Sequence, residues 1–129
     1  MVVTNQSDFI YAGNRRVLRF TVTDEDTSGS PPYDLTTSIV KFALAAFGGN
    51  NQPLKKNPKL SFSSLDASPQ VVITTPASGI VEVELLPADT VNLPPANYYF
   101  ELEVFNNTQT QSVVVATGTI EVRVNVENP

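Results

Sequence analysis

The stretch from Leu93 to Phe105 constrains the fold more than any other part of the chain, because it joins a proline turn directly to an alternating strand. Its first residues follow the form Leu-x-Pro-x-x-Tyr, with Leu93, Pro95 and Tyr98 at the defining positions. This is the pattern of a tyrosine corner, in which a Tyr near the start of a strand donates its hydroxyl to backbone a few residues upstream. Because proline fixes φ and cannot sit in a central strand, Pro95 also predicts where the strand begins. The corner predicts a Greek-key β-sandwich.

Alternation of apolar and polar residues with a period of two recurs along the rest of the chain, and no helical stripe of useful length accompanies it. In residues 17–23, for example, Leu18, Phe20 and Val22 form an apolar face. Similar segments predict strands over residues 39–47, 59–62, 71–74, 79–86, 98–105 and 112–126, with one helical turn over 87–93. Seven or eight such strands predict an all-β, two-sheet antiparallel sandwich in which residues 1–129 form a single domain.

Finer predictions concern the two ends of this sandwich. Residues 1–13 form either an edge strand around Phe9–Tyr11 or a flexible N-terminal arm. In the last strand, Gly118 predicts a bulge or bend. The apolar face beyond it consists of Ile120, Val122, Val124 and Val126. Because the sequence reaches Pro129 directly after this strand, we expect no fibre or receptor-binding domain behind it.

The composition argues against several functions: nucleic acid binding, catalysis by Cys or His, and membrane insertion. The net charge of −5 argues against a nucleic acid partner, because phosphate binding needs clustered Lys and Arg. The absence of Cys and His removes thiolate chemistry together with the commonest general base and metal ligand. Residues 1–16 lack the apolar segment of a signal peptide, and no apolar run is long enough to cross a bilayer. We therefore expect no cofactor, no membrane association and synthesis in a cytoplasm.

Paired carboxylates are the strongest argument for an enzyme, since glycoside hydrolysis uses two of them. Five glutamates take outward positions on the predicted strands: Glu82, Glu84, Glu101, Glu103 and Glu121. Strict alternation is what a solvated sheet face requires, with Arg19, Lys41 and Arg123 as cross-strand partners, whereas catalysis does not require it. We therefore expect no catalytic residues.

The acidic loop Asp24–Asp26 offers hard oxygen ligands for a cation such as calcium. The spacing of an EF-hand loop, with its central Gly and distal Glu, is missing. A solvated loop is the better interpretation, so the sequence predicts no metal site.

Candidate partner contacts come from two residue types. Basic residues cluster before the first long strand and around the loop at 48–57, where they either meet an acidic partner or keep a loop soluble. Exposed aromatic residues are common anchors of protein interfaces. The candidates are Tyr11, Arg15, Arg16, Tyr33, Lys55, Lys56, Lys59 and Tyr99.

Several segments of the chain resemble small structural proteins of tailed phages, including the N-terminal domain of upper baseplate proteins. Residues 34–44, which begin Asp-Leu-Thr and end Phe-Ala-Leu, resemble one recurring segment of that family. Residues 79–85, together with 88–94 and 98–102, resemble a second segment, and the strand at 16–23 is similar to the family's opening. The resemblance covers most of residues 14–124. It implies an immunoglobulin-like sandwich in a virion.

The function that this resemblance implies is structural. We expect a non-enzymatic virion protein that docks on other phage proteins, either as a capsid decoration or cement protein or as a tail or baseplate adaptor. The two placements have nearly equal support, and virion symmetry is compatible with a homotrimer. The alternative is a carbohydrate-binding or adhesion module on the same fold. That alternative predicts exposed aromatic residues grouped on one face, and the absence of Trp counts against it.

Overall fold

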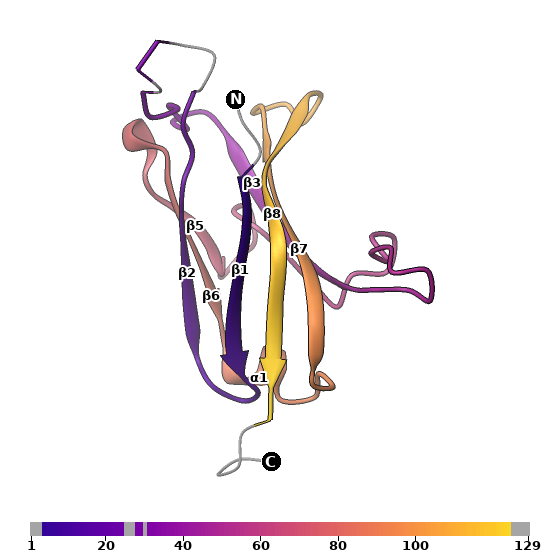
Figure 1. Ribbon diagram of the computed structural model, residues 1–129. Helices are drawn as coiled ribbons and strands as arrows, with labels where there is room; N and C mark the ends of the chain where they lie inside the picture. Colours follow the sequence, from indigo (N-terminus) through magenta and orange to yellow (C-terminus); the bar gives the residue numbers. More distant parts are fainter. Residues whose placement is uncertain (1–3, 25–27, 30, 125–129) are drawn as a thin grey trace.

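The structure is a computed structural model that describes residues 4–24, 28–29 and 31–124. Its regular elements are almost all strands. In chain order they are β1 (Thr4–Tyr11), β2 (Arg16–Thr21), β3 (Ile39–Ala46), β4 (Leu60–Ser63), β5 (Val71–Thr75), β6 (Ile80–Leu85), β7 (Ala96–Phe105) and β8 (Ser112–Arg123). Two short helical turns, η1 (Pro76–Ser78) and α1 (Pro87–Thr90), lie between strands. The strands form two sheets that pack face to face (Figure 1), which confirms the predicted all-β class.

The larger sheet has five strands in the order β1-β8-β7-β3-β4. β1 runs parallel to β8, and in Figure 1 their arrowheads lie side by side and point the same way. All other neighbours in this sheet are antiparallel. The N-terminal segment therefore forms the predicted edge strand over Thr4–Tyr11, which Ile10 anchors in the core with only 3% of its surface exposed. Residues 1–3 lie outside the described residues.

The smaller sheet has three antiparallel strands in the order β2-β6-β5. The chain moves repeatedly between the sheets: β1 belongs to the larger, β2 to the smaller, β3 and β4 to the larger, β5 and β6 to the smaller, and β7 and β8 to the larger. No helix in the described part of the chain is long and apolar enough to cross a membrane.

The core lies between the sheets and is built from the predicted apolar faces. Phe20 of β2 meets Phe100 of β7 with ring centroids 5.8 Å apart, and Phe42 of β3 stacks on Phe100 at 5.9 Å. Because alternate residues of a strand point to opposite faces, each strand contributes every second side chain. Further buried side chains are Leu18, Val22, Val40, Leu44, Val81, Val83, Leu85, Tyr98, Leu102, Val104, Ile120 and Val122.

The last strand differs from its prediction in two places. The register between β7 and β8 shifts between Leu102 and Glu103, whose partners are Ala116 and Val114, so the extra residue of the bulge is Val115. Gly118 instead pairs regularly with Phe100, and the predicted bulge there is wrong. The bulge turns two consecutive side chains inward, since Val115 and Ala116 are both 3% exposed.

Val124 was expected in the core but is 56% exposed. β8 ends at Arg123, so Val124 lies beyond the last ladder pair and its alternation no longer places it between the sheets. Val126 lies outside the described residues. An alternating sequence can thus continue past the point where the sheet itself ends.

The connection from β6 to β7 crosses between the sheets and packs against the sandwich. Thr90 is fully buried, and its Oγ1 accepts a hydrogen bond from the backbone N–H of Gly13 at 3.0 Å. The hydroxyl of Tyr98 donates to the carbonyl oxygen of Pro94 at 2.6 Å. Leu93 packs partly buried against the core, whereas Pro95 is exposed. These contacts hold the start of β7 in place.

Candidate partner-binding surface

The eight candidate contact residues do not form one surface. Tyr11 lies on β1, Arg15 and Arg16 lie where β2 begins, and Tyr33 lies in the connection from β2 to β3. The three lysines belong to a loop between β3 and β4, and Tyr99 lies on β7. We call residues 47–59 the lysine loop; it projects from the side of the sandwich in Figure 1.

The lysine loop has a defined backbone. The N–H of Gly48 donates to the carbonyl of Gln52 at 2.7 Å, and the N–H of Leu54 donates to that of Ala46 at 2.8 Å. The N–H of Lys59 donates to the carbonyl of Leu44 at 2.7 Å, which closes the loop where β4 begins. A further bridge joins Phe47 and Pro53. These contacts fix the backbone positions from which the side chains of the loop project.

One lysine of the loop turns back onto the larger sheet. The ammonium of Lys55 lies 3.1 Å from a carboxylate oxygen of Glu101 and 5.1 Å from the centre of the Tyr99 ring. The Tyr99 hydroxyl donates to the same oxygen of Glu101 at 2.7 Å, and Phe47 packs edge-on against Tyr99 at 6.5 Å. This cluster also lines a small hollow with Ala43. It attaches the loop to the outer face of the sheet.

Electrostatic interactions within this cluster favour the protonated forms of Lys55 and Tyr99. The hydrogen bond to Glu101 raises the pKa of Lys55 above its usual value, despite a smaller opposing effect of burial. Burial first, and the hydrogen bond to Glu101 second, raise the pKa of Tyr99. A lysine held in its charged form is not a nucleophile, so this cluster is suited to structure rather than to covalent chemistry.

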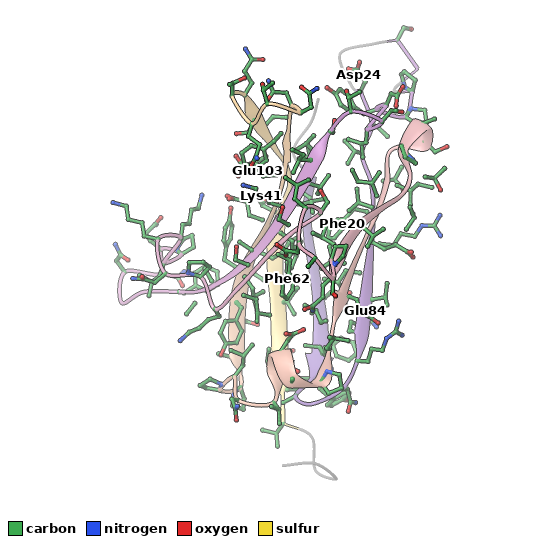
Figure 2. All side chains as sticks on the ribbon, turned by 180° about the vertical axis from the view of Figure 1, so that it is seen from behind. Phe20, Asp24, Lys41, Phe62, Glu84 and Glu103 are labelled. Atoms are coloured by element: carbon green, nitrogen blue, oxygen red, sulfur yellow. The ribbon has the colours of Figure 1, made fainter. Side chains whose placement is uncertain are left out.

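The other two lysines of the loop face solvent. Lys56 and Lys59 are exposed and make no ion pair with any residue that the structure describes. Figure 2 shows several nitrogen-tipped side chains leaving this loop. Leu54, in the same loop, has 49% of its surface exposed. The sequence interpretation missed Leu54; the signal was a single large apolar residue between Pro53 and three lysines in a polar loop.

Arg15 and Arg16 have partners within the chain. Arg15 forms an ion pair with Glu84 of β6. One terminal nitrogen of Arg16 donates to both carboxylate oxygens of Asp8, at 2.8 and 2.7 Å. These arginines tie β2 to its neighbours on either side, so a partner would have to compete with existing pairs.

Tyr33 is half-buried and packs against the core. Its backbone N–H donates to the carbonyl of Val22 at 2.9 Å. The side chain borders a shallow hollow of about 350 Å³ that reaches Val104 and Val113. Its main contacts are therefore internal.

Tyr11 belongs to a second exposed group at the β1 edge. Its ring meets Phe9 edge-on at 5.8 Å, and the guanidinium of Arg123 stacks 3.8 Å from the centre of the Phe9 ring. The Nε of Arg123 donates to Glu121 at 2.8 Å, and this hydrogen bond raises the pKa of Arg123. Phe9 and Tyr11 are 38% and 43% exposed. A shallow hollow of about 410 Å³ is lined by Phe9 and also by Asn97.

The glutamates occupy the outer faces of both sheets, as predicted from their alternation. Glu82 and Glu84 lie on the smaller sheet; Glu101, Glu103 and Glu121 lie on the larger. Figure 2 shows Glu84 and Glu103 on different sheets, with Lys41 beside Glu103. Lys41 faces Glu103 in register, and Arg19 faces Glu82. Glu82 and Glu103 thus have cross-strand neighbours of opposite charge. Arg123 instead pairs with Glu121 on its own strand, so its predicted cross-strand role is wrong.

Of the predicted acidic loop, Glu25 and Asp26 lie outside the described residues. Within the described part of the chain, no three acidic residues gather closely enough to hold a metal ion.

Comparisons with known proteins leave the function open. No family model and no curated protein matches the chain. Among solved structures, the chain is similar to one described as "the structural analysis of a family 123 glycoside hydrolase from Clostridium perfringens", with 10% identity and a TM-score of 0.43. The match covers 95% of this chain but only 23% of the solved one, so the chain spans about a quarter of that protein's length. Such a distant likeness carries no activity over to this chain.

Proposed function

We propose that this chain is a non-enzymatic structural protein of a tailed-phage virion, made in the host cytoplasm, which docks on other virion proteins. The observation that carries the proposal is the lysine loop. It is a hydrogen-bonded loop attached to a sheet through Lys55, yet it leaves Leu54, Lys56 and Lys59 exposed. A rigid module with an exposed contact loop suits docking better than catalysis.

An immunoglobulin-like Greek key is the finer fold that we propose. In the immunoglobulin strand names, β2-β6-β5 would correspond to B-E-D, and β4-β3-β7-β8 would correspond to C′-C-F-G. The bond from Tyr98 to Pro94, four residues upstream at the start of the F-like strand, supports a tyrosine corner. The strand order and this hydrogen bond both agree with the immunoglobulin-like sandwich that the resemblance to phage proteins implies.

Two virion placements fit this proposal, as capsid decoration or cement protein and as tail or baseplate adaptor, and either is compatible with a homotrimer. The copy number in purified particles of the encoding phage distinguishes them. Quantitative mass spectrometry should give a ratio near one to the major capsid protein for decoration, and a small fraction of it for a tail or baseplate protein. Absence from the particles would contradict the proposal.

One observation favours the alternative, a carbohydrate-binding or adhesion module. Phe9 and Tyr11 are exposed and in ring contact. Phe9 lines a hollow with Asn97 and Glu121, which offers aromatic surface next to hydrogen-bonding groups. The Arg123 guanidinium already covers the Phe9 ring, which weakens this alternative. A polysaccharide pull-down with wild type and with Phe9→Ala/Tyr11→Ala tests it. Retention that depends on both rings would favour this module over a purely structural role.

A further inference from the structure

We propose that the exposed side chains of the lysine loop, Leu54, Lys56 and Lys59, bind an acidic surface of another virion protein, an inference that rests on the proposed function. The structure separates these residues from Lys55, which is engaged by Glu101 and Tyr99 within the chain. Lys55 is therefore an anchor of the loop, and the contact surface is formed by the other three residues.

The loop is already ordered before any partner arrives. Hydrogen bonds between its own backbone groups and to Ala46 and Leu44 fix its course, and the Phe47–Tyr99 contact fixes its base. Gly48 lies against Leu54, because a Cβ at Gly48 would come within 3.1 Å of the Leu54 side chain. A preorganised loop loses little conformational entropy when it binds, so a few side chains can supply useful affinity.

Charge is distributed unevenly between the loop and the rest of the chain. The loop contains three of the four lysines, and no acidic residue occurs between residues 47 and 65. The whole chain has a net charge of −5, so removing the +3 of the loop leaves −8 for the rest. The loop is therefore the part of the molecule that an acidic surface attracts, and the remainder repels such a surface and favours one orientation of approach.

The exposed side chain of Leu54 indicates that the partner has an apolar depression as well as acidic groups. Leu54 presents a large apolar side chain in the same loop as Lys56, and interfaces typically combine a central apolar anchor with a charged rim. A phosphate backbone offers no apolar hollow for such an anchor, and an anionic lipid surface would meet the −8 of the remaining chain. The −8 of the remaining chain would also repel a long polyanion. An acidic protein surface with an apolar depression fits both features.

Competition between proteins during particle assembly tests this contact. Infected cells express wild type and one variant in equal amounts, and quantitative mass spectrometry measures both proteins in the lysate and in the purified particles. The variants are Lys56→Ala/Lys59→Ala and Leu54→Ser. The control is Asn107→Asp/Gln111→Glu, which makes the same change in net charge at exposed positions of the β7–β8 turn. Thermal melting of each purified protein verifies that it folds.

We expect both loop variants to enter particles about tenfold less well than wild type. Lys56→Ala/Lys59→Ala loses the charge at the rim of the contact, and Leu54→Ser loses its apolar anchor. The control should enter within about twofold of wild type. If folded loop variants enter as well as wild type, the loop is not the contact and the virion proposal stands. If wild type itself is absent from particles, the proposed function and this contact both fail.

The lysine loop could instead bind a second copy of this chain, and self-association tests that alternative. Sedimentation velocity of the purified wild type at about 0.05 M salt, where surface charges are weakly screened, should show no association that depends on Lys56 and Lys59. Self-association of wild type that Lys56→Ala/Lys59→Ala abolishes would identify the loop as a self-contact and overturn the proposed partner.

Discussion

Two loops of the molecule differ in how they meet the core. Residues 86–95, between β6 and β7, and the lysine loop, between β3 and β4, both contain proline and asparagine. The first buries Thr90 completely, although it leaves Val91 44% exposed, whereas no residue of the second is buried. A connection that crosses between sheets must cover the end of the core, but a loop between neighbouring strands of one sheet has no such constraint. Side chains in the first should therefore affect stability, and those in the second should affect binding.

The largest expected effect is at Gly79, in the turn between β5 and β6. This turn joins neighbouring strands of one sheet, but it packs against the backbone of Val22 and Tyr33. Gly79 has φ of +68°, and a Cβ there would lie 2.3 Å from the carbonyl oxygen of Val22. Gly79→Ala should lower the free energy of unfolding by about 3 kcal/mol or more, from strain and overpacking together. Gly49→Ala in the lysine loop is the matched control, because nothing lies within 4 Å of its added Cβ. In denaturant titration, Gly49→Ala should change the free energy of unfolding by no more than about 0.5 kcal/mol. Equal losses for Gly79→Ala and Gly49→Ala would contradict the difference between packed and exposed loops.

Thr90→Val tests the buried bond of the crossing connection. Valine keeps the shape of threonine but leaves the N–H of Gly13 without its acceptor, which should cost about 2 kcal/mol. Thr90→Ser keeps the acceptor and loses one methyl group, so its cost should be nearer 0.8 kcal/mol. Urea unfolding of both variants gives the comparison. A greater loss for serine would mean that packing, rather than the hydrogen bond, matters at this site.

Tyr98→Phe removes the hydroxyl that donates to Pro94. The lost hydrogen bond should lower the free energy of unfolding by about 1–2 kcal/mol, measured by thermal or urea unfolding. Tyr11→Phe serves as the control, since Tyr11 is 43% exposed at the sheet edge. An unchanged melting temperature for Tyr98→Phe would argue against a tyrosine corner.

Alkaline pH offers a finer test of the same residue. Burial raises the pKa of Tyr98 above its ordinary value of 10.0, so the folded protein holds this proton more tightly than the unfolded chain. The associated stability is complete below pH 10 and is lost as pH rises through the higher folded pKa. Tyr98→Phe should therefore reduce the slope of stability against pH above 10. Some slope should remain, because the pKa values of Tyr99 and Lys55 are raised as well.

The smallest effects are expected within the lysine loop. Lys55→Ala removes a partly exposed ion pair and should cost about 0.5 kcal/mol, whereas Lys56→Ala should leave stability unchanged. Paired urea titrations at low salt resolve the difference. Equal effects of the two substitutions would contradict the division of the loop into one anchor and one contact surface.

Local patterns determined much of this protein. Period-two alternation located most strands and most of the core, because the side chains of a strand alternate between its faces whatever its neighbours are. The pattern of Leu93, Pro95 and Tyr98 predicted a bond from Tyr98 to backbone a few residues upstream, and the acceptor is the carbonyl of Pro94. Even the outward glutamates followed from the same period.

Tertiary structure decided the features that depend on pairing between distant segments. Only the sheets reveal that β1 runs parallel to β8, that the bulge lies at Val115 rather than Gly118, and that β8 ends before Val124. The sequence also gives no reason to separate Lys55 from Lys56 and Lys59. The ladder between β3 and β7 places Tyr99 and Glu101 within reach of Lys55 alone, so register separates the anchor from the residues left to bind a partner.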